Sequence, residues 1–198
     1  MKHYELVLPE NYKIDKVIDA KSPKTGIIMN IASLIIMIII FIIGMAIYLS
    51  GKQEFKFEVG PKTFIALIVY FVGLFACIVL HELIHGLFYK IYTKQKLTFG
   101  ITWSAAFCGV PNVYVKKKAM LVTCMAPCVI ISCLLLIPLF LVKDLLFFMF
   151  ILLVFGGHFG GCCGDIYDSI LFITKYRKKE ILVNDTGAKQ TIYVKVNQ

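Results

Sequence analysis

Four long apolar runs alternate with short charged segments along the chain. The runs cover residues 27–49, 64–92, 119–142 and 145–174. Each is long enough to cross the hydrocarbon core of a bilayer as an α-helix, which takes about 20 residues. Pro127 and Pro138 fall in the third run, where they predict a kinked helix. The pattern therefore predicts about four transmembrane helices.

Two stretches depart from this helical pattern. Residues 97–115 mix β-branched and aromatic residues with glycine and proline, which predicts a short β-like loop. Near the C-terminus, apolar residues at 181–183 and 191–196 flank a turn at 184–187, which predicts a β-hairpin. The expected fold is therefore an all-α membrane protein of about four transmembrane helices, with this loop and a C-terminal hairpin.

Composition agrees with a membrane location. Hydrophobic residues make up 59% of the chain and charged residues 17%, well outside the usual range of soluble domains. The net charge is +9. The protein is nevertheless not expected to bind nucleic acid, because its basic residues lie between the apolar runs and not on a soluble domain. The expected surroundings are a lipid bilayer.

The distribution of basic residues predicts the orientation. Seventeen Lys and Arg fall in the first, third and fifth polar segments, and four in the second and fourth. The positive-inside rule then predicts a multi-pass cell-membrane protein with both termini in the cytoplasm. We expect a cytoplasmic N-terminal segment at 1–25, a transmembrane domain at 26–175 and a cytoplasmic tail at 176–198.

Candidate chemistry lies in the second run, where residues 81–85 read His-Glu-Leu-Ile-His. On a helix, His81 and His85 lie on one face and can bind one zinc ion, and Glu82 can act as general base. A five-residue motif can arise by chance. However, the chain has only four histidines, and ionisable groups inside a span cost about 2–3 kcal/mol each on insertion scales, so they are usually functional.

A catalytic zinc usually has three protein ligands. Counted from the starts of their spans, Asp165 in the fourth run and His81–His85 in the second reach a similar depth towards the cytoplasmic end. Asp165 is therefore the predicted third ligand. The surrounding glycines form small-x-x-x-small pairs at 156/160, 157/161 and 160/164, which favour close helix approach. The alternative is that this stretch serves packing alone, with Asp165 capping a helix.

Neighbouring residues leave further alternatives open. His158, seven residues before Asp165, is a candidate metal ligand, a group that supports one, or a stabiliser of the tetrahedral intermediate. Asp168 can orient a ligand histidine or lie as a polar residue at the membrane interface. Cys162 and Cys163 can be thiolate ligands or small packing residues. The seven cysteines are odd in number and mostly lie in apolar runs, so a disulfide framework is not expected.

The HELIH motif and the later Gly-Cys-Cys-Gly-Asp-Ile-Tyr stretch at 161–167 resemble the site-2-protease superfamily of intramembrane metalloproteases. Over roughly residues 60–175, the short four-span layout is most similar to a bacterial putative zincin peptidase family of unknown function. The resemblance implies that His81, His85 and Asp165 hold zinc and that Glu82 is the catalytic base. Site-2 proteases commonly carry Asn-Pro-Asp-Gly or a similar Asp-Gly motif, whereas Asp165 is followed by Ile166.

The predicted function is zinc-dependent hydrolysis of peptide bonds in a membrane protein or peptide substrate. The 97–115 stretch can pair with an extended substrate, or it can be an interfacial loop anchored by Trp103 and Tyr114. The alternative function is a non-proteolytic membrane protein with a structural or regulatory zinc site. A transporter or a bacteriocin-immunity-type partner is a third hypothesis. Few ionisable residues line a path across the spans, which argues against a transporter.

Overall fold

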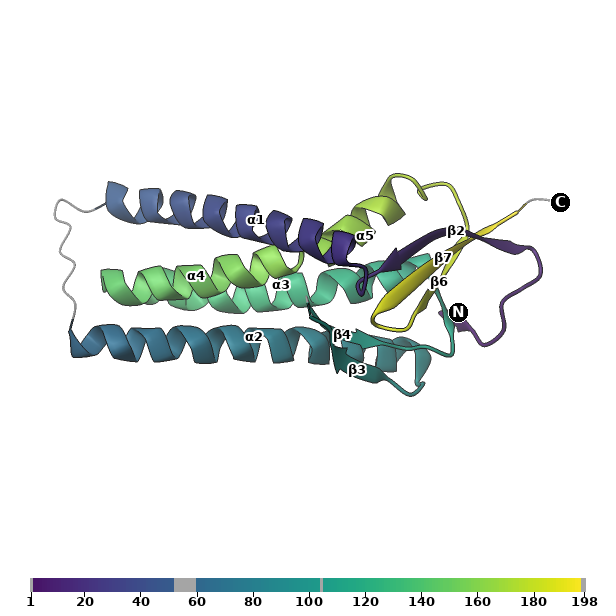
Figure 1. Ribbon diagram of the computed structural model, residues 1–198, viewed down its shortest axis with the longest axis horizontal. Helices are drawn as coiled ribbons and strands as arrows, with labels where there is room; N and C mark the ends of the chain where they lie inside the picture. Colours follow the sequence, from purple (N-terminus) through teal and green to yellow (C-terminus); the bar gives the residue numbers. More distant parts are fainter. Residues whose placement is uncertain (1, 52–59, 104, 197–198) are drawn as a thin grey trace.

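The computed structural model describes residues 2–51, 60–103 and 105–196. Most of this part of the chain is helical, and the helices lie roughly along one long axis (Figure 1). They are α1 Pro23–Ser50, α2 Pro61–Thr93, α3 Lys117–Leu141, α4 Leu145–Gly161 and α5 Cys163–Ile173. Residues 52–59, which carry much of the predicted polar loop at 50–62, lie outside the described residues.

Three helices, α1, α2 and α3, are long and apolar enough to cross a membrane. The α4–α5 pair is a fourth candidate if its two helices are counted as one span, because they are bent by 42° at a short break. About four spans were expected, and the fourth holds only in this bent form. Pro127 and Pro138 both lie inside α3, which is assigned as one helix.

Helix α4 packs against α1, α2 and α3, and so lies at the centre of the bundle. Large apolar side chains on the outside of the bundle remain more than half exposed, among them Ile42, Ile47, Phe64 and Phe75. Extended exposed apolar surface of this kind marks contact with a membrane or another apolar partner. The bundle therefore has the surface that the apolar runs predict.

Glycines bring α1 close to α4. A Cβ on Gly160 would lie 2.5 Å from the carbonyl oxygen of Ser33, and one on Gly156 would lie 3.2 Å from Met37. The 156/160 pair thus serves the close approach that the glycine spacing predicts. Gly161 and Gly164 differ, because a Cβ on either would meet nothing within 4 Å.

The expectation of an all-α fold is incomplete, because a five-stranded antiparallel sheet covers one end of the bundle. Its order is β1-β5-β6-β7-β2. The strands are β1 Tyr4–Glu5, β2 Tyr12–Asp19, β5 Tyr114–Lys116, β6 Ile181–Asp185 and β7 Lys189–Lys195. The predicted hairpin is present as β6 and β7. The N-terminal segment, expected only as polar chain, supplies the two outer strands.

A second, two-stranded sheet lies within the predicted β-like loop. It pairs β3 Thr98–Ile101 with β4 Ala106–Gly109 in antiparallel register, with Phe99 opposite Cys108. Strand β4 packs against α2, and the backbone N–H of Val110 donates to the carbonyl of Asp185 in β6 at 2.7 Å. The small sheet is therefore fixed between a helix and the larger sheet.

A buried cluster joins the helix ends to the large sheet. Tyr89 of α2, Met120 of α3 and Phe172 of α5 pack with Val183 and Ile192 of the sheet. Because three helices and two strands share this core, their relative positions are set together. The sheet end of the bundle is thus a rigid frame, and the motif on α2 lies beside it.

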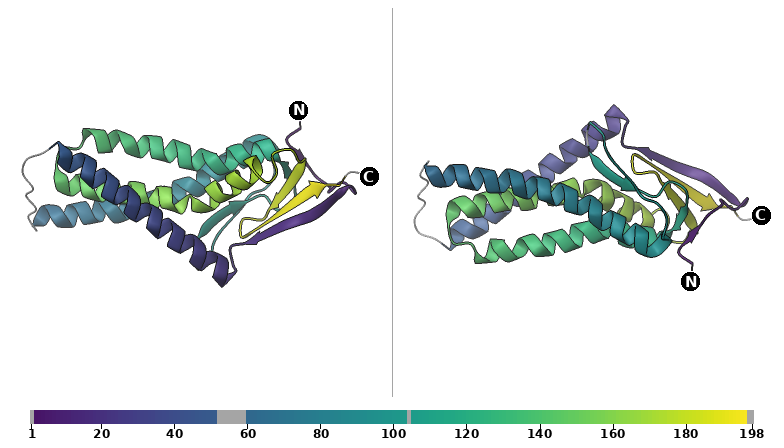
Figure 2. Two further views of the ribbon diagram at one scale, coloured as in Figure 1. Left: turned by 90° about the horizontal axis from the view of Figure 1, so that it is seen from above. Right: turned by 90° about the horizontal axis from the view of Figure 1, so that it is seen from below.

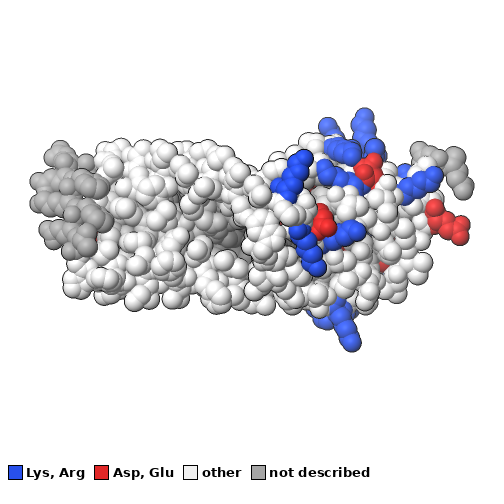
Figure 3. Space-filling model, in the orientation of Figure 1, with Lys and Arg blue, Asp and Glu red and all other residues white. Residues whose placement is uncertain are grey.

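Both described ends of the chain lie at the sheet end (Figure 1). On the face drawn in Figure 3, the Lys, Arg, Asp and Glu side chains gather over this end, and the described part of the bundle away from the sheet shows none of them. The segments predicted to share one side of the membrane therefore do lie together. That this side is the cytoplasm stays a prediction from the positive-inside rule.

Candidate metal centre

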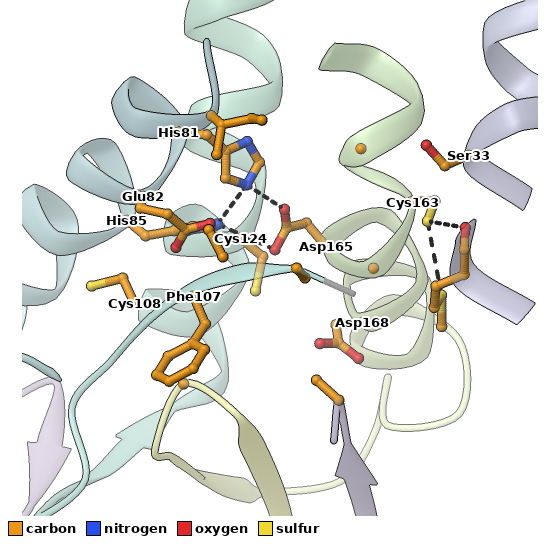
Figure 4. Close-up of a pocket in the computed structure, with 18 of the residues that line it drawn as sticks. Ser33, His81, Glu82, His85, Phe107, Cys108, Cys124, Cys163, Asp165 and Asp168 are labelled. Atoms are coloured by element: carbon orange, nitrogen blue, oxygen red, sulfur yellow. Dashed lines mark hydrogen bonds and ion pairs between the residues drawn. The ribbon is translucent and has the colours of Figure 1, made fainter. Parts of the chain in front are cut away.

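The two motif histidines lie on one face of α2, near its sheet end. Their Nε2 atoms are 3.0 Å apart, as expected for ligands one helical turn from each other. Glu82 lies beside them and, like both histidines, lines the same cavity (Figure 4). The spacing of the motif thus places all three side chains on the side of α2 that faces the cavity.

Asp165 completes this group from the first turn of α5. Its Oδ2 lies 3.1 Å from Nε2 of His81, and its Oδ1 lies 3.4 Å from Nε2 of His85 (Figure 4). The N-cap of α5 is Cys162, which makes no side-chain cap hydrogen bond. The carboxylate of Asp165 therefore faces the histidines, and its contacts are not those of a helix cap.

The two Nε2 atoms and the two carboxylate oxygens of Asp165 lie near the spacing that zinc requires of its ligand atoms. Zinc binds nitrogen and oxygen at about 2.0–2.2 Å in tetrahedral geometry, which places neighbouring ligand atoms roughly 3.3–3.6 Å apart. The Nε2 atoms of His81 and His85 are 3.0 Å apart, Oδ2 of Asp165 is 3.1 Å from His81, and Oδ1 of Asp165 is 3.4 Å from His85, so the atoms lie at this spacing or a few tenths of an ångström closer. Two imidazoles and a carboxylate are also a ligand set that zinc prefers. The residues present therefore fit zinc, with a fourth position left for water or substrate.

The other ring nitrogen of His85 has its own partner. Nδ1 lies 3.0 Å from the backbone carbonyl oxygen of Thr123 in α3. A carbonyl only accepts, so Nδ1 carries the proton, and in the neutral ring the lone pair is then on Nε2, which faces the candidate metal position. The sequence motif does not predict this contact, because every residue has a backbone carbonyl and the motif does not specify which one meets His85.

His158 lies on a different side of His81. Its ring is 5% exposed, and its centroid is 5.8 Å from that of His81. Sγ of Cys162 lies 3.8 Å from Nε2 of His158 and 3.9 Å from Nδ1 of His81. His81, His158 and Cys162 therefore form a second group that could hold a metal, but through the other nitrogen of His81.

The two groups share His81, and the geometry favours the one with Asp165. Its contacts are 3.0–3.4 Å, against 3.8–3.9 Å for the contacts of Cys162. His158 was expected to share a helical face with Asp165 if the helix is continuous. The bend between α4 and α5 breaks that continuity.

Asp168 lies one turn beyond Asp165 and also lines the cavity. Within the described part of the chain, no hydrogen bond joins it to either motif histidine, and its Oδ1 has no partner. Asp168 was considered as a group that orients a ligand histidine, but the contact to Nδ1 of His85 comes from the Thr123 carbonyl. Cys163 points away towards α1, where its thiol donates to the carbonyl of Met29 at 3.3 Å.

The cavity has a volume of about 410 Å³. Residues of the first turns of α1 line it, and at this end α1 diverges from the other helices (Figure 2). Its walls come from the first turns of α1, the motif face of α2, α5, β4 and the β6–β7 turn. Glu82, Asp165, Asp168 and Asp185 supply its acidic groups. The candidate metal position therefore borders a space large enough for a short stretch of polypeptide.

Two ionisable groups outside the helices also line this cavity. Burial raises the pKa of the Cys108 thiol to about 12, so this group is neutral near pH 7. Burial also raises the pKa of Asp185, although the Tyr89 hydroxyl and the Gly187 N–H donate to its carboxylate. Sequence reasoning did not single out either residue.

These features define a class of protein. The chain is mostly helical, has three or four candidate membrane spans, and joins a His-Glu-x-x-His helix to an aspartate with zinc spacing. Residues 74–181, more than half of the sequence, match the family described as "Putative zincin peptidase". The chain belongs to this family, whose description is that of a zinc peptidase.

The matched range runs from the middle of α2 to the start of β6 and contains all four residues of the candidate centre. It leaves out α1 and the strands β2 and β7. No curated protein and no solved structure matches the chain. The resemblance to site-2 proteases therefore continues to rest on the sequence motifs.

Proposed function

We propose that the protein is a zinc-dependent peptidase that hydrolyses peptide bonds of membrane-associated substrates. One observation carries this proposal. The Nε2 atoms of His81 and His85 and the carboxylate of Asp165 converge at zinc spacing, with Glu82 on the same helical turn and a cavity in front of them. Membership of a zinc peptidase family supports the same reaction class.

His81, His85 and Asp165 would hold the metal. Zinc in that position supplies Lewis acidity, which lowers the pKa of water and favours negative charge on a carbonyl oxygen. Glu82 takes the proton of the attacking water and later gives it to the leaving amine. Asp165 and the Thr123 carbonyl keep the two imidazoles oriented, so the chain's own groups set the geometry before substrate arrives.

A substrate must be locally extended, because a helix hides its carbonyl groups in hydrogen bonds. Strand β4 suits such a substrate. It lines the cavity from Ala106 to Cys108, and among the described residues its strand partner is β3, on one edge only. We propose that the substrate pairs with the other edge of β4, which would present one peptide bond to the metal position.

The alternative role for this stretch was an interfacial loop anchored by Trp103 and Tyr114. Trp103 is 61% exposed, in keeping with such an anchor. Tyr114 instead belongs to β5, and its ring packs edge-on against Tyr193 of β7 at 5.4 Å. Anchoring by Trp103 and substrate pairing along β4 are compatible, because they use different residues.

The test compares the parent protein with a Glu82→Gln variant. Zinc bound to protein purified in detergent is measured by atomic emission, and new peptide termini in the membrane fraction of expressing cells are measured by mass spectrometry. Glu180→Gln is the matched control, because Glu180 pairs with Lys195 on the exposed sheet surface. We expect all three proteins to bind zinc and only Glu82→Gln to lose the new termini.

Two results would count against the proposal. If the parent binds no zinc, the metal centre itself is wrong. If zinc binds but Glu82→Gln leaves the pattern of termini unchanged, the protein is not a peptidase of this type. The second result would favour a membrane protein with a structural or regulatory zinc site.

A further inference from the structure

The Thr123 carbonyl lacks the partner that a helix normally provides. In an α-helix, the carbonyl of one residue accepts from the N–H four residues later. Four residues after Thr123 comes Pro127, which lies inside α3 and has no N–H. The ring of a proline also crowds the carbonyl four residues before it. The Thr123 carbonyl is therefore free to accept from outside its own helix.

This carbonyl is in a place where a free acceptor is costly. Thr123 is fully buried, at 0% exposure, in a helix that is apolar enough to span a membrane. An unpaired backbone group in such surroundings costs several kcal/mol, since no water can replace the missing donor. The side chain of Thr123 does not compete for the carbonyl, because its hydroxyl donates to the carbonyl of Ala119 at 2.9 Å.

The donor that replaces the missing N–H is Nδ1 of His85, 3.0 Å away. His85 is itself 8% exposed, so its ring has little access to water. The contact therefore satisfies two buried groups at once. It also holds the proton on Nδ1, which leaves the lone pair of Nε2 facing His81 and Asp165.

We infer that Pro127 is a positioning residue for the candidate zinc centre: it removes the helical donor of the Thr123 carbonyl so that this carbonyl can fix the tautomer and orientation of His85. The inference rests on the proposed zinc site and adds a residue that touches neither metal nor substrate. In this view, the proline in α3 is part of the metal centre, although it lies 42 positions after His85 in sequence.

The second proline of α3 provides the matched control. Pro138 frees the carbonyl of Leu134 in the same way, but Leu134 is 56% exposed and lies about 16 Å further along the helix. Replacing either proline by alanine restores one helical hydrogen bond and improves helix propensity. Only Pro127→Ala introduces an N–H that competes with His85.

The measurement is the zinc affinity of the purified proteins, determined by competition with a chelator. Loss of a contact that orients a metal ligand typically lowers metal affinity about tenfold to a hundredfold. We expect a loss of that size in Pro127→Ala and parental affinity in Pro138→Ala.

A second measurement does not depend on the folding of any variant. Nitrogen NMR of histidine-labelled parent protein reports which ring nitrogen of His85 carries the proton. A protonated Nδ1 supports the inference, and an unprotonated Nδ1 overturns it. Equal zinc affinity of Pro127→Ala and Pro138→Ala overturns it as well, while leaving the proposed function intact. A parent that binds no zinc overturns both.

Discussion

Replacing Gly160 by alanine tests how closely α1 must pack on α4 to form the cavity wall. The added Cβ would lie 2.5 Å from the carbonyl oxygen of Ser33 and 3.0 Å from its Oγ. Carbon and oxygen atoms of neighbouring helices normally approach no closer than about 3.3 Å. The two helices would therefore have to separate by about 0.8 Å, because the obstructing atom is backbone and cannot rotate away.

The cost can be bounded from this geometry. Adding a methyl group to a filled contact destabilises by about 1–3 kcal/mol, whereas removing a glycine from a helix gains at most about 1 kcal/mol. The net change in the free energy of unfolding should therefore be a loss of up to about 2 kcal/mol. For a chain of this size, a loss of about 2 kcal/mol lowers Tm by about 4–8 °C.

Gly161→Ala is the matched control, because the next residue of the same helix has nothing within 4 Å of its built Cβ. It should match or exceed the stability of the parent. The assay is thermal unfolding in one detergent, followed by intrinsic fluorescence or circular dichroism. If Gly160→Ala proves as stable as Gly161→Ala, the close contact between α1 and α4 is not present in solution and the reasoning is refuted.

Three further predictions concern the frame around the centre. Tyr89→Phe removes the hydroxyl that donates to the buried Asp185, and should lower the free energy of unfolding by about 1–3 kcal/mol in denaturant titrations; no loss would mean that water or another donor replaces it. Hydrogen bonds from the Lys175 ammonium and, to a smaller extent, the Tyr176 hydroxyl lower the pKa of Asp15. The ionised Asp15 therefore contributes stability above the ordinary carboxyl pKa, and this contribution disappears as pH falls through the lowered pKa. Asp15→Asn should therefore destabilise at pH 7 and flatten the acid side of a Tm-versus-pH profile; an unchanged profile would show that the ion pair contributes nothing. Gly187→Ala should destabilise by more than 1 kcal/mol, because φ is +88° and the added Cβ would strike the Phe107 ring, and limited proteolysis of β4 should speed up; an unchanged cleavage rate would contradict the predicted displacement of β4.

The sequence determines the helices and the motif, because both depend on local information. Unbroken apolar runs of about 20 residues predict spans wherever they occur, and four-residue spacing places His81 and His85 on one face of any helix. The prediction of Asp165 as a ligand took a longer argument. It required comparing the depth of Asp165 in the fourth run with the depth of His81 and His85 in the second. The structure brings it to 3.1 Å from His81.

The apolar runs and residue spacing do not predict the five-stranded sheet. Its outer strands β1 and β2 come from the N-terminal segment, and they pair with chain more than a hundred residues away. Short polar strands carry little signal of their own, because their stability comes from cross-strand partners. Position along the chain does not specify which distant strand will be the partner.

Tertiary structure also decided which groups meet at the centre. The bend between α4 and α5 turns Asp165 towards both histidines and leaves His158 beside the other nitrogen of His81. Backbone carbonyls are chemically alike in every residue. Only the packing of α3 against α2 brings the carbonyl of Thr123 to His85. Residue types and spacing specify the donors that a chain contains; the contacts among them depend on distances that only the folded backbone sets.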